Sequence, residues 1–413
     1  CRGNSTFGGY CHSATLPHGQ WMDLMKHYDV VIVGGGIVGS STAYYLRKNG
    51  FTGSIAVIEK DPTYSKACTP LSWGGIRGQF STPENILLSS FTLRLIRGLK
   101  QEFGADADIS FRERGYLVLA SATSADTLMS NAKLQNDLGV DTVLFDQKEL
   151  LKKFPYANFD GVALGSLGRS GEGWFDPYGF LQLIRKGAIA KDVTYIADEV
   201  VGIEADDEVK SVTLKAAGKI SAGALVNAGG TSGGAIAAMV GFDLPVSAAK
   251  RYVYVVDCPA APDAFRAGPA WFNPDGVYWR PEGRNFLFGF TPSDDEEPKI
   301  KDWEMEHHWF EEKIWPSVYE RIPACEALKV VSSYVGHYDY NWFDYNGVIG
   351  RHPSLENFYF GNGFSGHGIQ QGPATGNALA ELICFGEYRS IDLKAMGVER
   401  IAENRPLFEK NIF

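Results

Sequence analysis

The residues most clearly arranged for chemistry are spaced glycines and one glutamate near the amino terminus. An apolar run at 29–33 breaks into GGGIVG at 34–39, and a second apolar run at 55–58 ends on Glu59. In a G-x-G-x-x-G turn the first glycine permits the sharp bend, the second lets the backbone approach a pyrophosphate, and the third lets the following helix pack closely. Unpaired N–H groups at the start of that helix face the phosphates. Glu59 is placed to accept hydrogen bonds from both hydroxyls of an adenosine ribose.

These residues are predicted to lie on a strand, a helix and a second strand. Because the glycines and the acid occur in this context, we expect the chain to bind a dinucleotide through its ADP half. A loop at 61–80, rich in small and hydroxyl residues, is expected to contact the far half. Strands beginning at 220 and 358 also run into glycine-rich turns. In a doubly wound sheet such turns lie on the ligand side, at the carboxyl ends of the strands.

The bulk composition argues against several classes of function. The 413 residues carry a formal net charge of −10 without a basic patch, which argues against nucleic-acid binding. The uncharged segment 220–242 is too rich in glycine and polar residues for a membrane span. The six cysteines have no CxxC or metal-ligand spacing, so we expect free thiols in a reducing compartment and no metal site. The length suits two domains.

The first twenty-odd residues are poor in acidic side chains. The sequence starts at Cys1 rather than Met, and no acidic residue precedes Asp23. The segment is either an acid-poor remnant of a transit peptide or an artefact, and Met22 could itself be a start codon.

Three local patterns predict structure further along the chain. Asp176 is placed to cap a helix that begins at Pro177. The spacing of apolar residues predicts an amphipathic helix over 303–318, and the acidic run 294–297 is expected to be a solvated loop.

Taken together, the motifs resemble the FAD-dependent D-amino-acid and sarcosine oxidase family. The matching pieces span nearly all of 28–393 in the family's order, and they are DVVIVGGGIVGSSTAYYL with Glu59, the loop to Arg77, GWFDPYGFLQLI, ALVNAGGTS and FYFGNGFSGHGIQQGPATG. The resemblance implies a mixed α/β fold in which a Rossmann-like, glutathione-reductase-like FAD-binding domain is interleaved with a smaller substrate domain built on a mixed β-sheet. The implied division is an extension at 1–26, an FAD-binding domain at 27–80, 160–247 and 336–393, a substrate domain at 81–159 and 248–335, and a tail at 394–413.

The resemblance also implies the residues of the site. Those expected near the substrate or the reacting end of the flavin are His367, Arg77, Tyr278 and Gln370. For His367 a structural or electrostatic role near the pyrimidine ring is favoured over acid–base catalysis, while Arg77 either braces its loop or faces the flavin. The residues expected to bind FAD are Gly34, Gly36, Ile37, Val38, Gly39, Glu59, Lys60, Ser72, Trp73, Gly74, Arg77, Val200, Ala228, Gly229, Gly363, Gly366, His367, Gly368 and Ile369.

Four positions depart from the family's pattern. Gln370 replaces the lysine that pairs a substrate carboxylate, and Phe80 replaces a second arginine of the loop. Leu287 occupies the position of the family's oxygen-activating lysine. Gly336 occupies the position of the cysteine that tethers flavin covalently in some members of the family. We therefore expect FAD to bind non-covalently and the protein to act as a dehydrogenase rather than a fast oxidase.

The expected function is an FAD-dependent oxidoreductase that oxidises an amine or amino acid by hydride transfer to flavin N5. A narrower resemblance, to a mitochondrial branch of the family associated with assembly of respiratory complex I, gives the alternative of a flavin-bearing assembly factor or accessory subunit. Its partners would be complex I subunits on the matrix side; the bacterial cytoplasm is the alternative location. An NAD-linked Rossmann dehydrogenase would leave the flavin-side motifs unexplained.

Overall fold

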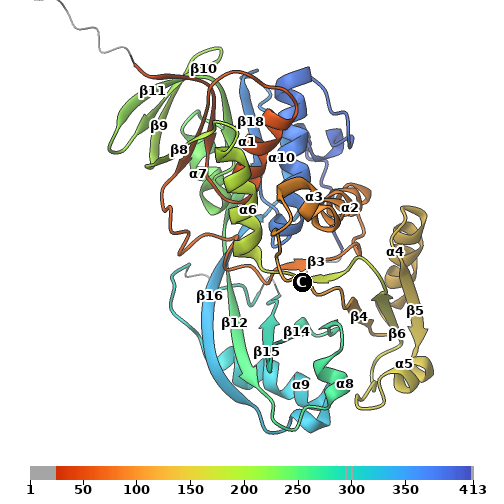
Figure 1. The fold of residues 1–413 in the computed structure, drawn as a ribbon. Helices are drawn as coiled ribbons and strands as arrows, with labels where there is room; N and C mark the ends of the chain where they lie inside the picture. Colours follow the sequence, from red (N-terminus) through yellow and green to blue (C-terminus); the bar gives the residue numbers. More distant parts are fainter. Residues whose placement is uncertain (1–24, 294, 299–300, 411–413) are drawn as a thin grey trace, which may run out of the picture.

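Two large sheets organise the molecule, one in each half of the view in Figure 1. The computed structural model describes residues 25–293, 295–298 and 301–410, so most of the predicted amino-terminal extension and one residue of the acidic run lie outside the described residues.

The first sheet has a parallel centre with antiparallel additions. Its central order is β18-β11-β1-β2-β8, all parallel, with β17 antiparallel at one edge and β10 and β9 extending from β11. The strands are β1 (His27–Val33), β2 (Ile55–Glu59), β8 (Thr194–Ala197), β9 (Val200–Ala205), β10 (Val209–Leu214), β11 (Gly218–Asn227), β17 (Val348–Arg351) and β18 (Phe358–Asn362).

Both faces of this sheet are covered, as a near-continuous apolar run such as that of β1 requires. Val30 and Ile32 pack into one apolar cluster with helices on their side, while Val31 and Val33 pack into another with α7, β9 and β10. The helices of the first side are α1 (Ile37–Lys48), α2 (Pro83–Arg97), α3 (Leu99–Phe103), α6 (Pro177–Ile189) and α10 (Gly368–Phe385), and α7 is Gly233–Ala238.

The second sheet is mixed and strongly aromatic. Its order is β16-β12-β15-β14-β13-β4-β6-β5, with only β13 and β4 parallel among the pairs of the described residues. The strands are β4 (Tyr116–Ala120), β5 (Thr142–Asp146), β6 (Leu164–Gly168), β12 (Val246–Asp257), β13 (Ala270–Phe272), β14 (Val277–Glu282), β15 (Asn285–Phe290) and β16 (Lys329–Asn341).

One face of the second sheet is closed and the other faces the first half of the molecule. Trp271 and Trp279 stack with ring centroids 5.7 Å apart on the closed face, under α5 (Gln147–Lys153), α8 (Asp263–Arg266) and α9 (Trp315–Arg321). Tyr116, Phe272 and Tyr278 form the opposite face together with Trp174 of the short pair β3 (Gly75–Ile76) and β7 (Gly173–Trp174). α4 (Ala125–Asp137) contributes to that side.

The cap predicted at Asp176 is confirmed, because its carboxylate accepts the Gly179 N–H at 3.0 Å. The helix predicted over 303–318 is wrong at its start, since regular helix runs from the π-turn at Phe310–Ile314 through α9. The buried ammonium of Lys250 binds Asp302 and Glu306 at 2.6 and 3.2 Å, and these ion pairs hold the preceding segment in an irregular path.

The domain division stays a prediction, and sheet membership suggests how to refine it. β6 and the start of 336–393 pair within the second sheet, although both were grouped with the FAD-binding segments. α2 and α3 pack into the core of the first sheet, although 81–159 was grouped with the substrate segments. We propose that β6 and β16 belong to the substrate domain, and that α2 and α3 belong to the FAD-binding domain.

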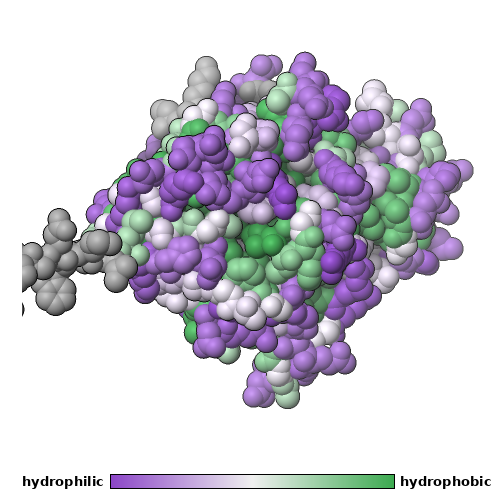
Figure 2. Space-filling model, turned by 90° about the horizontal axis from the view of Figure 1, so that it is seen from above, coloured by the Kyte–Doolittle hydropathy of each residue, from purple (hydrophilic) through white to green (hydrophobic). Residues whose placement is uncertain are grey.

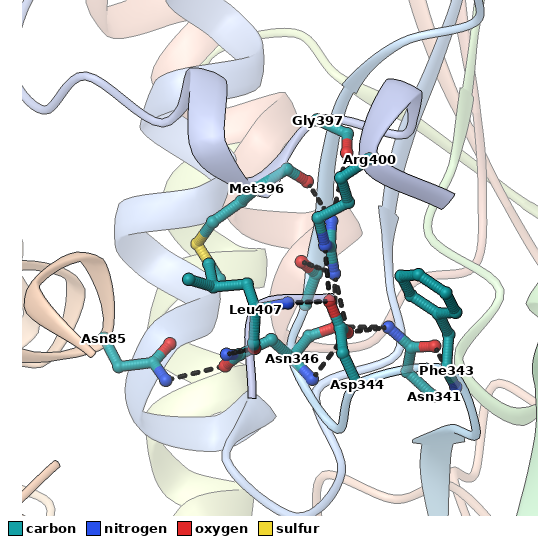
Figure 3. A network of polar contacts seen from close by, with 10 residues as sticks. Asn85, Asn341, Phe343, Asp344, Asn346, Met396, Gly397, Arg400 and Leu407 are labelled. Atoms are coloured by element: carbon teal, nitrogen blue, oxygen red, sulfur yellow. Dashed lines mark hydrogen bonds and ion pairs between the residues drawn. The ribbon is translucent and has the colours of Figure 1, made fainter. Parts of the chain in front are cut away.

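A buried polar network fixes the carboxyl-terminal segment, which contains the 3-10 turn Lys394–Met396 and α11 (Glu399–Ala402) (Figure 3). Asp344 binds the Arg400 guanidinium through Nε at 2.7 Å and Nη2 at 3.0 Å, with both side chains buried. Asp344 also accepts the Leu407 N–H, and Asn346 binds both Leu407 and Asn85 of α2. The segment is thereby attached to the turn after β16 and to α2.

Other surface and cysteine predictions can be compared with the structure. Among the described residues, no helix combines the length and apolarity needed to cross a membrane. The face seen in Figure 2 is largely hydrophilic, with a hydrophobic area near its centre and another toward the right of the view. Cys68, Cys258, Cys325 and Cys384 are free, as predicted, and Cys1 and Cys11 lie outside the described residues.

Candidate active site

A cavity of about 510 Å³ lies where the two sheets face each other. This volume is typical of sites for cofactors and small ligands. One wall comes from the carboxyl ends of β1, β2 and β11 and from the start of α10, and the other comes from β12, β14 and β16. The cavity therefore joins the predicted nucleotide-binding turns to the predicted substrate sheet.

The glycine turn after β1 forms one end of this cavity. Gly34 has φ +100°, and a Cβ there would lie 2.3 Å from the Ala228 carbonyl oxygen, so only glycine fits. Gly36, Ile37 and Val38 line the cavity at the start of α1. The Ile37 N–H donates to Thr69 Oγ1 at 3.2 Å, which ties the following loop to the helix start.

Glu59 is held at the same end by the backbone. Its Oε2 accepts the Gly35 N–H at 2.8 Å, and its Oε1 accepts the Asp61 N–H at 2.9 Å. Each carboxylate oxygen can accept a further hydrogen bond. The half-buried carboxylate is therefore oriented, and it retains acceptor capacity for hydroxyl groups.

Trp73 connects the loop after β2 to the second sheet. Its ring meets Tyr278 edge-on with centroids 5.1 Å apart, and its carbonyl accepts hydrogen bonds from the Arg280 guanidinium at 2.9 and 3.2 Å. The buried Trp73 Nε1 has no hydrogen-bond partner among the described residues. A buried donor of this kind indicates a place for a ligand acceptor.

The wall from the second sheet is aromatic and carries one buried cation. Arg251 and Val253 of β12, Tyr278 of β14, and Gly336 and Tyr338 of β16 line it. Burial raises the pKa of Tyr278 well above its ordinary value, so its phenol keeps the proton and can donate a hydrogen bond.

A fully buried network lies behind the lining and contains Arg77, His367 and Gln370. The Arg77 N–H donates to Gln370 Oε1 at 2.8 Å, and Arg77 Nη2 lies 3.4 Å from His367 Nε2. Burial, with the nearby Arg77 charge, holds the pKa of His367 well below its ordinary value. The imidazole is therefore neutral at pH 7. The Arg77 guanidinium also stacks on the Phe80 ring, 3.9 Å from its centroid.

Glu172 anchors the loop that carries Arg77. Its carboxylate accepts the N–H groups of Gly78 and Gln79 at 2.7 and 3.1 Å and the Gln79 amide at 2.8 Å. Burial raises the pKa of Glu172 to about 7. Sequence reasoning did not single out Glu172, because it is 94 residues from Gly78 in the chain and comes to this loop only in the folded protein, where β3 pairs with β7.

The structure brings most of the predicted site residues to the cavity. The predicted residues that line it are Gly34, Gly36, Ile37, Val38, Glu59, Lys60, Ser72, Trp73, Ala228, Gly229, Tyr278, Gly366, Gly368 and Ile369. Those that do not are Gly39, Gly74, Arg77, Val200, Gly363, His367 and Gln370.

The predicted residues outside the lining pack against neighbouring backbone or form hydrogen bonds with residues that line the cavity. A Cβ on Gly39 would lie 1.9 Å from the Gly34 carbonyl oxygen, so this glycine permits the close approach of α1 to the turn. Gly363 donates its N–H to Asp339, and Gly74 packs on the Phe175 carbonyl. Val200 is buried in β9, while its neighbour Glu199 lines the cavity.

Sequence reasoning missed several lining residues. Thr69 and Lys66 lie in the loop that was predicted to contact the ligand, and they could have been selected as its hydroxyl and charged members. Arg251 and Tyr338 carry no such signal, because strand alternation alone does not reveal which face is the cavity. The acidic run is also more than a solvated loop, since Glu297 is half-buried and paired with Arg251 at 2.8 Å.

The residues present fit FAD. Gly34 and Gly36 line the cavity without side chains, two helix starts border it, and an oriented carboxylate lies at one end. The unpartnered Trp73 Nε1 and the aromatic wall suit a flat heteroaromatic ring.

The profile of the FAD dependent oxidoreductase family, termed DAO, matches residues 29–382. The chain belongs to this family. It is 40% identical to the FAD-dependent oxidoreductase domain-containing protein 1 of Xenopus laevis, over 96% of this chain and 89% of that protein. It is 25% identical to mouse mitochondrial sarcosine dehydrogenase over 91% of this chain and 41% of that protein. The L-proline dehydrogenase of P. horikoshii has a similar structure, with a TM-score of 0.81, 26% identity and coverage of 93% and 100%.

These findings confirm the predicted family, the mixed α/β fold and the FAD-dependent oxidoreductase class. The matched range includes all the residues that line the cavity. Members of the family act on CH–NH groups, as this chain was predicted to do.

Proposed function

We propose that this protein oxidises a small amine or amino acid at the carbon next to nitrogen, as a dehydrogenase. The observation that carries the proposal is the single cavity that joins the turn at Gly34 and Glu59 to Tyr278 of the second sheet. Two similar proteins named for dehydrogenation, of sarcosine and of L-proline, support this chemistry.

When bound, FAD supplies the acceptor for the hydride that leaves the substrate. The chain's own residues bind and orient the cofactor and the substrate. Glu59 and the start of α1 hold the nucleotide end, and the aromatic wall excludes water from the reacting end. Tyr278 offers a protonated hydroxyl in that wall. His367 is neutral and outside the lining, so its proposed role is to support the loop rather than to exchange a proton with substrate.

The dehydrogenase assignment rests on the charges near the second sheet. The first electron passed to O₂ creates an anion that a nearby fixed cation stabilises in a low-dielectric site. Leu287 is buried on β15 and does not line the cavity. Arg280 binds Glu282, and Arg251, the buried cation of the cavity wall, binds Glu297, so each of these charges has a counter-charge.

Reoxidation kinetics test this assignment. The holoprotein, photoreduced without air, is mixed with aerated buffer, and the return of the oxidised flavin band is followed. We expect slow return in air and fast return with a quinone or dye. Reoxidation in air as fast as in an authentic oxidase would refute the assignment. Leu287→Lys, which places a cation at the position of the family's oxygen-activating lysine, should accelerate the reaction with oxygen.

We also propose that FAD is held without a covalent bond. Gly336 occupies the position of the tethering cysteine, lines the cavity and has no reactive side chain. After acid precipitation the yellow colour should remain in the supernatant, and colour retained in the pellet would contradict the proposal.

A second candidate function is that of an assembly factor or accessory subunit of mitochondrial respiratory complex I. The narrower resemblance motivates it, and Trp315 and Tyr319 expose 43% each on one face of α9, where a protein partner could contact them. Affinity capture of the native chain should retain complex I subunits in mitochondrial fractions, and Trp315→Ala should weaken that capture. Recovery of the native protein only as a free cytosolic species would refute both the complex I partner and the mitochondrial location.

A further inference from the structure

Two cysteines lie next to each other on the closed face of the second sheet. Cys258 follows the end of β12, and Cys325 ends the 3-10 turn Pro323–Cys325 that follows α9. Their sulfur atoms are 2.8 Å apart, although the two residues are 67 positions apart in the chain. Both side chains are fully buried in the apolar cluster that contains Trp271 and Trp279. The fold therefore brings together two thiols that their sequence positions do not associate.

The pairing of β12 with β16 holds the two thiols in this position. Asp257 pairs with Lys329 at the end of the ladder, so Cys258 follows the last pair on one strand and Cys325 shortly precedes it on the other. The Cys325 N–H donates to the Ile322 carbonyl at 2.8 Å, which fixes the turn. The two sulfur atoms need only a small closing movement to form an S–S bond, whose length is about 2.05 Å.

The surroundings make the two thiols differ in acidity. Contact with Cys325 and the charge of Arg266 lower the pKa of the Cys258 thiol, against the effect of its burial. Contact with Cys258, together with burial, raises the pKa of the Cys325 thiol. Arg266 is held beside the pair because its guanidinium donates to the Cys258 carbonyl and lies over the Phe286 ring, 5.5 Å from the centroid. The thiolate is the form of cysteine that attacks oxidants, so we expect Cys258 to react first.

We propose that Cys258 and Cys325 form a reversible disulfide when the protein meets a peroxide oxidant. With hydrogen peroxide, the Cys258 thiolate attacks one oxygen, the O–O bond breaks, hydroxide leaves and Cys258 becomes a sulfenic acid. The Cys325 sulfur then attacks the Cys258 sulfur, and the S–O bond breaks as water leaves with the proton of Cys325. Two electrons pass from the two sulfur atoms to the peroxide, and a dithiol reductant restores both thiols.

The disulfide closes a loop that contains much of the second sheet. β13, β14, β15 and α9 all lie between the two cysteines in the chain. A cross-link across a long loop stabilises a fold mainly by restricting the unfolded chain. The cysteine pair is therefore a redox-dependent cross-link of the second sheet. This inference is independent of the proposed function, since neither cysteine lines the cavity that joins the two sheets.

Peptide mapping of the holoprotein detects the bond directly. Protein treated with hydrogen peroxide is quenched in acid, its free thiols are blocked with N-ethylmaleimide under denaturing conditions, and it is digested with trypsin. Cys258 lies in the tryptic peptide 252–266 and Cys325 in the peptide 322–329. We expect these peptides to be joined, with a mass two hydrogens below their sum, and to separate in dithiothreitol. Blocked thiols at both positions, or sulfinic acid at either without the joined peptide, would overturn the proposal.

Thermal unfolding measures the structural consequence of the bond. The peroxide-treated wild type should melt about 5 °C above the dithiothreitol-treated protein. Cys258→Ala and Cys325→Ala should each abolish this difference, and Cys384→Ala, the matched control on α10, should retain it. Each comparison is made within one variant, so a loss of stability from the substitution itself does not affect it. A difference that persists in Cys258→Ala, or equal melting of the two wild-type forms, would refute the stabilising cross-link.

Dimedone, which traps sulfenic acids, tests the order of the two steps. In Cys325→Ala the second thiol is absent, so peroxide should leave a sulfenic acid on Cys258 that dimedone labels. In Cys258→Ala, Cys325 should be labelled more slowly. Faster labelling of Cys325 than of Cys258 would refute the assignment of Cys258 as the attacking thiol.

Discussion

Glu59 illustrates how one side chain is prepared for a ligand by its own backbone. The Gly35 and Asp61 N–H groups orient the carboxylate, which would otherwise rotate freely at the end of β2. Hydrogen bonds to a charged acceptor are each worth about 1.5–3 kcal/mol. We therefore expect the oriented Glu59 carboxylate to affect both the affinity for FAD and the orientation of FAD in the cavity.

We predict that Glu59→Ala weakens FAD binding by about 10- to 150-fold, since about 1.5–3 kcal/mol of charge-assisted hydrogen bonding is lost. Fluorescence titration of the apoprotein with FAD measures this. Glu199→Gln is the control, because Glu199 lines the same cavity and pairs with Lys215. Unchanged affinity in Glu59→Ala would mean that the carboxylate does not face the ribose.

Glu172 should make stability depend on pH in a particular direction. Its folded pKa of about 7 lies above the ordinary value of 4.5, so the folded state keeps its proton to higher pH than the unfolded chain. The contribution of this proton is complete below about pH 4.5 and is lost as pH rises through about 7. We predict that the stability difference between the wild type and Glu172→Gln is larger at pH 5 than at pH 8.

Urea unfolding at both pH values measures this difference. The amide should destabilise at either pH, because it places an NH₂ group against the donating Gln79 amide. A difference that grows with rising pH would show that Glu172 is ionised in the folded state.

At the scale of elements, the packing of α1 on the turn after β1 determines the shape of the nucleotide end. Gly39 lies where α1 touches the Gly34 carbonyl, and α10 packs beside α1. The two helix starts that border the cavity are thus held by close helix contacts rather than by flexible loops.

We predict that Gly39→Ala destabilises the fold by about 1–3 kcal/mol, because the new methyl group overlaps the Gly34 carbonyl and pushes α1 away. FAD affinity should fall at the same time, because the N–H groups of α1 move. Gly202→Ala in β9 is the control, since its Cβ would meet only Thr213 at an ordinary 3.6 Å. Thermal unfolding with and without FAD measures both effects, and a wild-type melting temperature would contradict the packing argument.

At the scale of the whole molecule, the carboxyl-terminal segment connects parts of the chain that are distant in sequence. Glu409 accepts hydrogen bonds from Ser81 and from the Thr82 N–H at the start of α2, and Arg400 binds Asp344 after β16. These contacts attach the last described residues to both the helix layer and the end of the second sheet.

We predict that Arg400→Met destabilises the protein by about 3–5 kcal/mol, because Asp344 is left as a buried charge without its partner. Arg405→Met breaks only an exposed pair with Glu403 and should cost less than about 1 kcal/mol. The double change Asp344→Asn with Arg400→Met should cost less than the sum of the single changes. Chemical unfolding of the four variants provides the measurement, and strict additivity would argue against a coupled pair.

Local residue spacing is enough to predict the nucleotide end of the cavity and the family. The glycines, the strand and helix around them and Glu59 lie within about one βαβ unit, so local spacing is enough to place them. The same locality explains why the cap at Asp176 was predictable from Asp176 and Pro177 alone.

Which charges face the cavity depends on contacts between segments that are far apart in the sequence. Arg251 and Glu297 are 46 residues apart, and Arg77 and Gln370 are 293 apart, so their pairing depends on how the two sheets fold against each other. Strand alternation assigns Arg251 to a face but does not reveal what that face meets. The start of the helix predicted over 303–318 failed for the same reason, because ion pairs to Lys250 on another strand outweigh local periodicity.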